Sequence, residues 1–255
     1  MLGAIVGDIV GSVYEFNNIK TKKFPLLSKG CDMTDDSVMT IAVADIMKNG
    51  YINDKEKIID TFKKWGKKYP YAGYGAKFFD WVLGENRKPY NSCGNGSAMR
   101  VSPVAWYANS PKEVIEYATK VTEVTHNHPE GIKGAIVTAM CIYYARIGKS
   151  KDFIKKYVEK YYDINFDYEE LRKNYYHGAE ICQVTVPQAI YCFLISKDFE
   201  DCVRTTISIG GDCDTTAAIS CAIAEAYYGI PGKIKNKISK YLTEEMKEVL
   251  SIEQI

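Results

Sequence analysis

An apolar segment near the start of the chain carries glycine at every fourth position, and this spacing strongly constrains the fold. Residues 3–15 are largely apolar and place Gly3, Gly7 and Gly11 at i, i+4 and i+8, on one face of a helix. Glycine costs about 1 kcal/mol relative to alanine at each interior helical position, so a close contact must offset it. We expect the close approach of a neighbouring helix; backbone contact with a ligand is the alternative.

Helical periodicity continues through the rest of the sequence, whereas strand-like alternation is scarce. Turn signals such as Ser110-Pro111 and His128-Pro129 separate the helical segments. Between Tyr175 and Val186, β-branched and aromatic residues also allow a short strand. Further helices are expected at residues 35–48, 54–67, 74–84, 97–108, 111–124, 131–147, 151–162, 184–196, 199–207, 213–228 and 233–250. Because no linker or repeat divides the chain, we predict one compact all-α domain over residues 1–255.

Composition narrows the class of protein. The 33 basic and 32 acidic residues give a net charge of +1, which makes no case for a nucleic-acid partner. The eight cysteines are scattered without a C-x-x-C pair, which fits a reducing cytoplasm. The apolar run from Met1 to Gly11 lacks a basic start and is interrupted by Asp8, so it does not resemble a signal peptide. We expect a cytoplasmic monomer without a membrane span.

Two short acidic segments are the strongest candidates for a functional site. They are Thr34-Asp35-Asp36 and Asp212-Cys213-Asp214-Thr215, which together offer four carboxylates and two hydroxyls. These hard oxygen ligands suit Mg²⁺ or Mn²⁺ better than Zn²⁺ or copper. Four negative charges are what two divalent cations would neutralise. If the segments converge in space, they form a two-metal site.

Each acidic segment is also compatible with a role that needs no metal. Threonine followed by acidic residues is a common helix start, because the hydroxyl and carboxylates satisfy free N–H groups and the helix dipole. The second segment exceeds what a cap needs, and Gly210 and Gly211 before it would let the backbone approach a ligand. It also fits the D-x-D-x-T signature of haloacid-dehalogenase-type phosphatases. That class needs the motif after an early strand, whereas here it lies near the C-terminus and precedes a helical pattern.

Two further segments are candidates for ligand contact. Residues 95–103 lead glycine and small residues into a helix, where backbone N–H groups can bind a phosphate and Arg100 can pair with an anion. The alternative is a loop with an arginine salt bridge. Residues 125–131 contain His126 and His128, which could serve as metal ligands, acid–base groups or substrate donors, or lie on a surface loop. Beside an oxygen-rich site, the pair favours substrate contact.

Taken in order, these segments resemble the ADP-ribosylglycohydrolase family. The resemblance runs nearly end to end, through residues 3–8, 14–16, 34–36, 94–100, 125–126 and 210–215. It implies a compact all-α domain around a binuclear Mg²⁺ or Mn²⁺ centre.

The resemblance also implies roles for individual residues. It implies metal ligation by Thr34, Asp35, Asp36, Asp212, Asp214 and Thr215. It implies catalytic roles for Glu15, Asp35 and Asp80, with Glu15 or Asp80 as general acid or base. It implies substrate contacts for Asn95, Gly96, Ser97, Met99, Arg100, His126, Gly210 and Gly211.

The implied reaction is hydrolysis of the bond at C1″ of the distal ribose of ADP-ribose. The expected substrate is ADP-ribosylated arginine on a protein, and the alternatives are linkages to serine, a nucleic-acid base or a small molecule. A non-enzymatic binding or structural protein is a further alternative, because an eye-lens crystallin shares the family's fold. The presence of suitable residues at all six ligand positions favours the enzyme.

Overall fold

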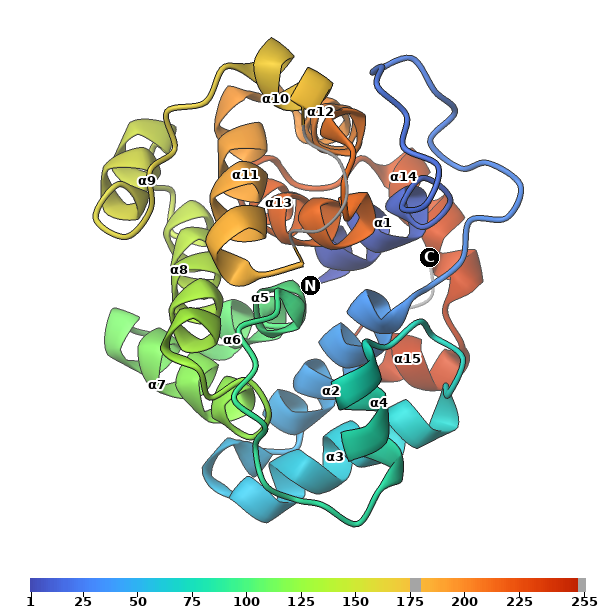
Figure 1. Ribbon diagram of the computed structural model, residues 1–255, viewed down its shortest axis with the longest axis vertical. Helices are drawn as coiled ribbons and strands as arrows, with labels where there is room; N and C mark the ends of the chain where they lie inside the picture. The colour runs from blue at the N-terminus through green and yellow to red at the C-terminus, as the bar shows by residue number, and fades with distance from the viewer. Residues whose placement is uncertain (175–179, 252–255) are drawn as a thin grey trace.

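The protein, seen in a computed structural model, is described at residues 1–174 and 180–251 and consists of helices joined by loops (Figure 1). These residues form no β-strand, and their one extended pairing is an isolated bridge between Gly94 and Ile181. This confirms the predicted all-α class. The helices are α1 (Leu2–Gly11), α2 (Asp35–Lys48), η1 (Tyr51–Asn53), α3 (Lys55–Lys68), α4 (Ala76–Leu83), α5 (Gly96–Met99), α6 (Ser102–Tyr107), α7 (Pro111–Glu123), α8 (Pro129–Arg146), α9 (Lys151–Val158), α10 (Tyr168–Asn174), α11 (Cys182–Ile195), α12 (Phe199–Ile209), α13 (Cys213–Tyr228), α14 (Gly232–Ile238), η2 (Ser239–Tyr241) and α15 (Glu244–Val249).

Several predicted elements differ from the observed ones. The helix expected at 97–108 is divided into α5 and α6, because Pro103 occupies the first turn of α6 and starts a new helix. The helix expected at 233–250 is divided before α15, where the Thr243 side chain accepts a hydrogen bond from the Met246 amide. Helix α10 was not predicted. The strand allowed at 175–186 is wrong for residues 182–186, which are helical, and residues 175–179 lie outside the described part.

The glycine face of α1 packs directly on α13. A Cβ added at Gly3 would lie 2.3 Å from the carbonyl oxygen of Cys221, and one added at Gly7 would lie 2.3 Å from that of Ala217. At Gly11 the added atom would meet the first turn of α13 at 2.5 Å. Helix contact therefore accounts for the glycine spacing, as predicted, and it holds the end of α1 against the start of α13.

A substitution on this face tests the packing. We expect Gly7→Ala to destabilise the protein by about 1–3 kcal/mol, because the new methyl group overlaps backbone atoms that cannot move aside. Since about 1 kcal/mol shifts Tm by roughly 2–4 °C in a domain of this size, thermal unfolding measures the change. Gly232→Ala is the matched control, since nothing lies within 4 Å of its added Cβ. Equal Tm values for the two variants would contradict close packing of α1 on α13.

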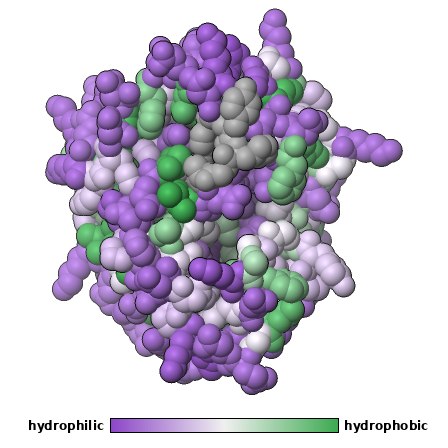
Figure 2. Space-filling model, in the orientation of Figure 1, coloured by the Kyte–Doolittle hydropathy of each residue, from purple (hydrophilic) through white to green (hydrophobic). Residues whose placement is uncertain are grey.

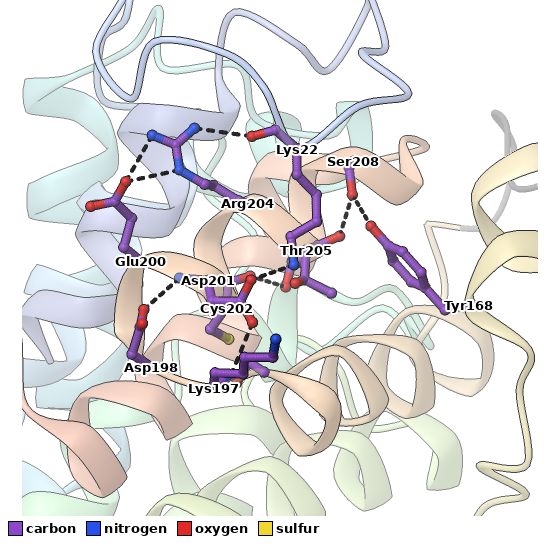
Figure 3. A network of polar contacts seen from close by, with 12 residues as sticks. Lys22, Tyr168, Lys197, Asp198, Glu200, Asp201, Cys202, Arg204, Thr205 and Ser208 are labelled. Atoms are coloured by element: carbon purple, nitrogen blue, oxygen red, sulfur yellow. Dashed lines mark hydrogen bonds and ion pairs between the residues drawn. The ribbon is translucent and has the colours of Figure 1, made fainter.

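The long loop between α1 and α2 is attached to α12 by a polar network (Figure 3). Arg204 donates hydrogen bonds to the carbonyl oxygens of Phe24 (2.6 Å) and Lys22 (3.1 Å). The Lys22 ammonium pairs with the Asp201 carboxylate one turn earlier on the same helix. These contacts hold the segment that follows Glu15 against α12.

The structure shows a mostly hydrophilic face (Figure 2) and free cysteines, as the composition led us to expect. The face in Figure 2 is mostly hydrophilic, with small, separate hydrophobic patches. Within the described residues, no helix has the length and apolarity needed to cross a membrane. All eight cysteines are free, and seven of them are buried, where a free cysteine behaves as a small apolar side chain.

Candidate active site

The two acidic segments lie in direct contact at the start of two helices. Thr34 precedes α2, and Asp212 precedes α13. The Thr215 hydroxyl donates a hydrogen bond of 3.0 Å to Oδ2 of Asp36, which lies 179 positions away in the sequence. The convergence proposed from the sequence is therefore present in the structure.

Helix capping accounts for only one of the two segments. The Thr34 hydroxyl accepts a hydrogen bond from the Asp36 amide, so Thr34 caps α2 as expected. Asp212 stands at the cap position of α13 but makes no capping hydrogen bond with its side chain. Its Oδ2 accepts a 2.6 Å hydrogen bond from the Asn95 amide group instead. The carboxylate of Asp212 therefore faces the site rather than the helix end.

Asp8 belongs to the same cluster, although no role in the site was predicted for it from the sequence. It is fully buried on α1. Its Oδ2 accepts hydrogen bonds from the backbone amides of Thr34 and Ser37, both at 3.0 Å, and its Oδ1 accepts one from the Thr34 hydroxyl at 2.7 Å. The available signal was a single carboxylate within an apolar helix face, between Gly7 and Gly11. Asp8 therefore fixes the start of α2 against α1.

The carboxylates form two adjoining groups that share one residue. Oxygen atoms of Asp8, Asp36 and Asp214 lie within 4.8 Å of one another, and so do oxygen atoms of Glu15, Asp212 and Asp214. Because Asp214 belongs to both groups, the two sets of oxygens are neighbours. This arrangement has the donor chemistry of two adjacent sites for hard divalent cations.

Burial raises the pKa of five carboxyl groups in and beside the cluster, those of Asp8, Glu15, Asp35, Asp36 and Asp214. Burial is the largest cause throughout, and repulsion from neighbouring carboxylates adds to it for Asp35, Asp36, Asp214 and Glu15. The pKa rises to about 6 for Asp8, about 7 for Glu15 and about 8 for Asp35. Among the described residues, no lysine or arginine forms an ion pair with any member of the cluster.

The cluster fits a bound cation in two respects. Oδ1 of Asp36 is buried and has no hydrogen-bond partner among the described residues, which is unfavourable for a carboxylate oxygen. The uncompensated negative charge of the cluster also needs a partner. A divalent cation would satisfy both needs, and the oxygen donors suit Mg²⁺ or Mn²⁺.

The raised pKa values predict an unusual pH dependence for the metal-free protein. The folded-state pKa of Asp35 and of Asp36 lies above its ordinary value of 3.8, so the folded state binds more protons than the unfolded chain between these values. Stability therefore falls as pH rises through this window. Between about pH 6.5 and about pH 8.5, in EDTA, we expect wild type to lose about 1 kcal/mol relative to Asp35→Asn, because this window spans the pKa of Asp35 at about 8.

The comparison with Asp35→Asn cancels titrating groups elsewhere in the protein, and chemical denaturation at each pH measures the difference. Excess Mg²⁺ should remove the pH-dependent loss, because it favours the ionised carboxylates. If the free energy of unfolding of wild type in EDTA rose relative to the variant between about pH 6.5 and about pH 8.5, the raised pKa in the folded state would be contradicted.

A pocket of about 510 Å³ opens beside the cluster and brings together most of the predicted site residues. The predicted residues that line it are Glu15, Thr34, Asp35, Asp36, Asn95, Gly96, Met99, Arg100, His126, Asp212, Asp214 and Thr215. Its wall also includes residues that the sequence did not single out, among them Phe16, Phe78, Tyr90, Ser92 and Glu180. Several of these come from loops, where no periodicity marks which side chains face a ligand.

Four predicted site residues do not line the pocket. Asp80 is exposed on α4. The Ser97 hydroxyl is buried and donates a 2.8 Å hydrogen bond to the carbonyl oxygen of Gly131. Gly210 and Gly211 both have positive φ angles, at 80° and 72°, in the turn before α13. The roles predicted for these four residues stay predictions.

Asn18 shows why the turn at residues 210–211 needs glycine. Its side-chain amide donates hydrogen bonds to the carbonyl oxygens of Glu15 (2.9 Å) and Gly211 (3.0 Å), and its Oδ1 accepts one from the Gly211 amide (2.7 Å). A Cβ added at Gly210 would lie 2.8 Å from this oxygen. Asn18 thus joins the segment that carries Glu15 to the turn that carries Asp212.

Arg100 is a buried part of the pocket wall. It is 1% exposed, and its guanidinium carbon lies 4.5 Å from the centre of the Phe62 ring and 5.6 Å from that of Phe78. Nη2 donates a 2.6 Å hydrogen bond to the Thr125 hydroxyl. Within the described residues Arg100 forms no salt bridge, so that alternative from the sequence is not what the structure has.

The two histidines of the 125–131 segment have different environments. His126 is buried and lines the pocket. His128 caps α8, because its Nδ1 accepts a hydrogen bond from the Glu130 amide at 3.1 Å. Of the pair, only His126 is placed to contact a ligand in this pocket.

Comparisons with known proteins agree with this geometry. The family model for ADP-ribosylglycohydrolase matches residues 1–254. The chain is 28% identical to human ADP-ribosylhydrolase ARH3 over 306 residues, an alignment that covers 90% of this chain and 84% of the human protein. It is 22% identical to the ADP-ribosyl-(dinitrogen reductase) glycohydrolase of Rhodospirillum rubrum, with 98% and 94% of the two chains covered.

A solved structure described as an ADP-ribosylglycohydrolase-related protein complex has a similar fold. The TM-score is 0.71 at 23% identity, and the superposition covers 97% of this chain and 93% of the other.

The helical fold, the carboxylate-lined pocket and the family match together identify a hydrolase. The chain belongs to the ADP-ribosylglycohydrolase family. This membership confirms the family and the enzyme class that the sequence predicted.

Proposed function

We propose that this enzyme hydrolyses the glycosidic bond between ADP-ribose and a modified arginine side chain. The observation that carries the proposal is the meeting of the two acidic segments in one pocket, together with the family membership. The relatives named above are described as hydrolases of ADP-ribosyl groups, which supports ADP-ribose as the common part of the substrate.

Acidic and aromatic side chains on the pocket wall favour a cationic leaving group. Glu15 and Glu180 place two carboxylates on its wall. Phe16, on the same wall, is 83% exposed and offers an aromatic face. A guanidinium group pairs with carboxylates and stacks on aromatic rings, whereas a serine hydroxyl has neither property. This combination supports arginine among the possible linkages.

Two divalent cations, Mg²⁺ or Mn²⁺, are proposed as cofactors. Thr34, Asp35, Asp36, Asp212, Asp214 and Thr215 are the proposed ligands, and Asp8 adjoins the same oxygens. When bound, such ions would orient the ribose hydroxyls and activate the attacking water.

The protein's own groups supply the remaining chemistry. The transition state at C1″ has oxocarbenium character, so the neighbouring carboxylates stabilise the positive charge that develops there. Glu15 is the proposed acid–base group, because its carboxyl group lies beside Asp212 and Asp214 at the pocket mouth. Burial, followed by the charge of Asp212, raises the pKa of Glu15 to about 7, a value suited to proton transfer near neutral pH. Asn95 orients Asp212 through the hydrogen bond at 2.6 Å.

A substrate panel tests the proposed specificity. The protein is incubated with Mg²⁺ and ADP-ribosylated arginine, ADP-ribosylated serine or ADP-ribose esters, with EDTA as the control, and released ADP-ribose is measured. We expect Mg²⁺-dependent release from arginine. Release from serine alone would overturn the arginine proposal, and no release from any substrate would favour a binding protein that shares the family fold.

We further propose that residues 1–255 act as one catalytic domain, as a cytoplasmic monomer. The family match over residues 1–254 supports the domain, and the uninterrupted hydrophobic core supports folding as one unit. Sedimentation of the purified protein tests the oligomeric state.

A further inference from the structure

A short line of hydrogen bonds runs from Arg100 to the pocket through Thr125 and His126. Nη2 of Arg100 lies 2.6 Å from the Thr125 hydroxyl oxygen, which lies 2.8 Å from Nδ1 of His126. The three residues are 1%, 0% and 5% exposed. Bulk water therefore does not compete for these bonds, and the positions of the protons follow from the chemistry of the groups.

Arg100 determines which group donates and which accepts in each of these two hydrogen bonds. A guanidinium group can only donate hydrogen bonds, so the Thr125 oxygen accepts the first bond. Thr125 then has one proton of its own to donate. Nδ1 of His126 at 2.8 Å is a good acceptor for it, whereas the carbonyl oxygen of Thr122, at 3.5 Å, is at the limit of hydrogen bonding. The Tyr90 hydroxyl also contacts Thr125. Because it carries a proton of its own, it can donate a hydrogen bond to the Thr125 oxygen and does not need the Thr125 proton.

The opposite edge of the imidazole ring, which carries Nε2, faces Gly94 and Gly96 of the pocket wall. A Cβ added at Gly96 would lie 3.3 Å from Nε2 of His126, and one added at Gly94 would lie 3.6 Å from it. Both glycines line the pocket. Among the described residues no protein group accepts a hydrogen bond from this nitrogen, so the ring edge is available to a ligand.

The surroundings also keep the ring uncharged. Burial, followed by the positive charge of Arg100, lowers the pKa of His126 well below its usual value. With Nδ1 occupied as an acceptor, a neutral ring carries its proton on Nε2.

We propose that Thr125 is a positioning residue that holds His126 in the neutral tautomer with the proton on Nε2. The ring then presents a fixed hydrogen-bond donor to the pocket, suited to a phosphate or hydroxyl oxygen of the bound ligand. The identity of that ligand rests on the function proposed above, but the tautomer does not. Arg100 acts from behind the ring and makes it a stronger donor.

The tautomer can be read directly by NMR of protein labelled with ¹⁵N-histidine. The chain has three histidines, and His126→Gln identifies the signals of the one in the pocket. We expect the long-range ¹H–¹⁵N pattern of the Nε2–H tautomer in wild type and in Thr125→Ser, which keeps the hydroxyl. Thr125→Val, which lacks it, should populate the Nδ1–H tautomer. An Nδ1–H tautomer in wild type, or an unchanged pattern in Thr125→Val, would overturn the proposal.

Thr122→Val is the matched control. It removes a buried hydroxyl from the neighbouring end of α7, and this hydroxyl has no hydrogen-bond partner in the part of the chain that the structure describes. It should leave the tautomer unchanged, whereas a change equal to that of Thr125→Val would show that the effect is merely structural and would contradict the assignment.

Kinetics and metal binding separate this inference from the proposed function. In Thr125→Val we expect KM to rise about tenfold with a smaller change in kcat, as for the loss of one hydrogen bond to a charged group. The rise in Tm produced by Mg²⁺ should be unchanged. An unaltered KM would overturn the role in ligand contact. If wild type released no ADP-ribose from any substrate, the proposed function would fail while the tautomer assignment stood on its spectrum.

Discussion

We expect Asp212→Ala to lower turnover by more than about 100-fold, since even the residues that only orient metal ligands contribute about 10- to 100-fold. Asp212 lies with Glu15 and Asp214 in one group of oxygens, so its removal opens the cluster where substrate and cation would meet. The rise in Tm that Mg²⁺ gives the wild-type protein should disappear at the same time. Asp35→Ala should show the same loss of turnover and of the Mg²⁺-induced rise in Tm, because Asp35 lines the same pocket.

The control for this prediction is Asp163→Ala, which removes an exposed carboxylate that is not part of the pocket wall. It should keep wild-type activity and the wild-type response to Mg²⁺. Full activity in Asp212→Ala or in Asp35→Ala is incompatible with the proposed metal site.

The second large effect is expected for Glu15→Gln. Loss of a general acid or base lowers the rate by about 10²- to 10⁴-fold, and we expect this loss in kcat with little change in KM. The amide keeps the size of the side chain and its place beside Asp212 and Asp214, so metal-induced stabilisation should persist. Steady-state kinetics and a thermal-shift titration with Mg²⁺ measure the two quantities.

Glu180→Gln is the matched variant for Glu15→Gln, because Glu180 lies on the wall of the same pocket. It should raise KM for the arginine substrate and leave kcat largely intact. If Glu15→Gln kept kcat within about twofold of wild type, the acid–base role would belong to another residue.

Much of the fold was accessible from the sequence because its signals are local. The spacing of Gly3, Gly7 and Gly11 implied a closely packed partner helix, and α13 is that partner. Thr34 and the acidic residues after it marked the start of α2 correctly. Periodicity failed where a new helix begins inside a helical pattern, as at Pro103, and where α10 forms.

The site was less accessible because its contacts are long-range. The bonds of Asp8 to Thr34 span 26 positions, and those of Asn18 to Gly211 span 193. No spacing in the sequence relates such residues, so Asp8, although it lies in the 3–8 motif, was assigned no role, and Asn18 carried no signal. Arg100 shows the same limit, because its burial against Phe62 follows from packing and not from its motif.

The central claim is that the two acidic segments form one centre for two divalent cations, and metal titration tests it most directly. Mn²⁺ is titrated into metal-free protein by calorimetry, with wild type compared with Asp212→Ala. The account predicts two ions per chain in wild type and loss of at least one in the variant. Wild-type protein that binds no Mn²⁺, or that binds it equally well after Asp212 is removed, would contradict the claim.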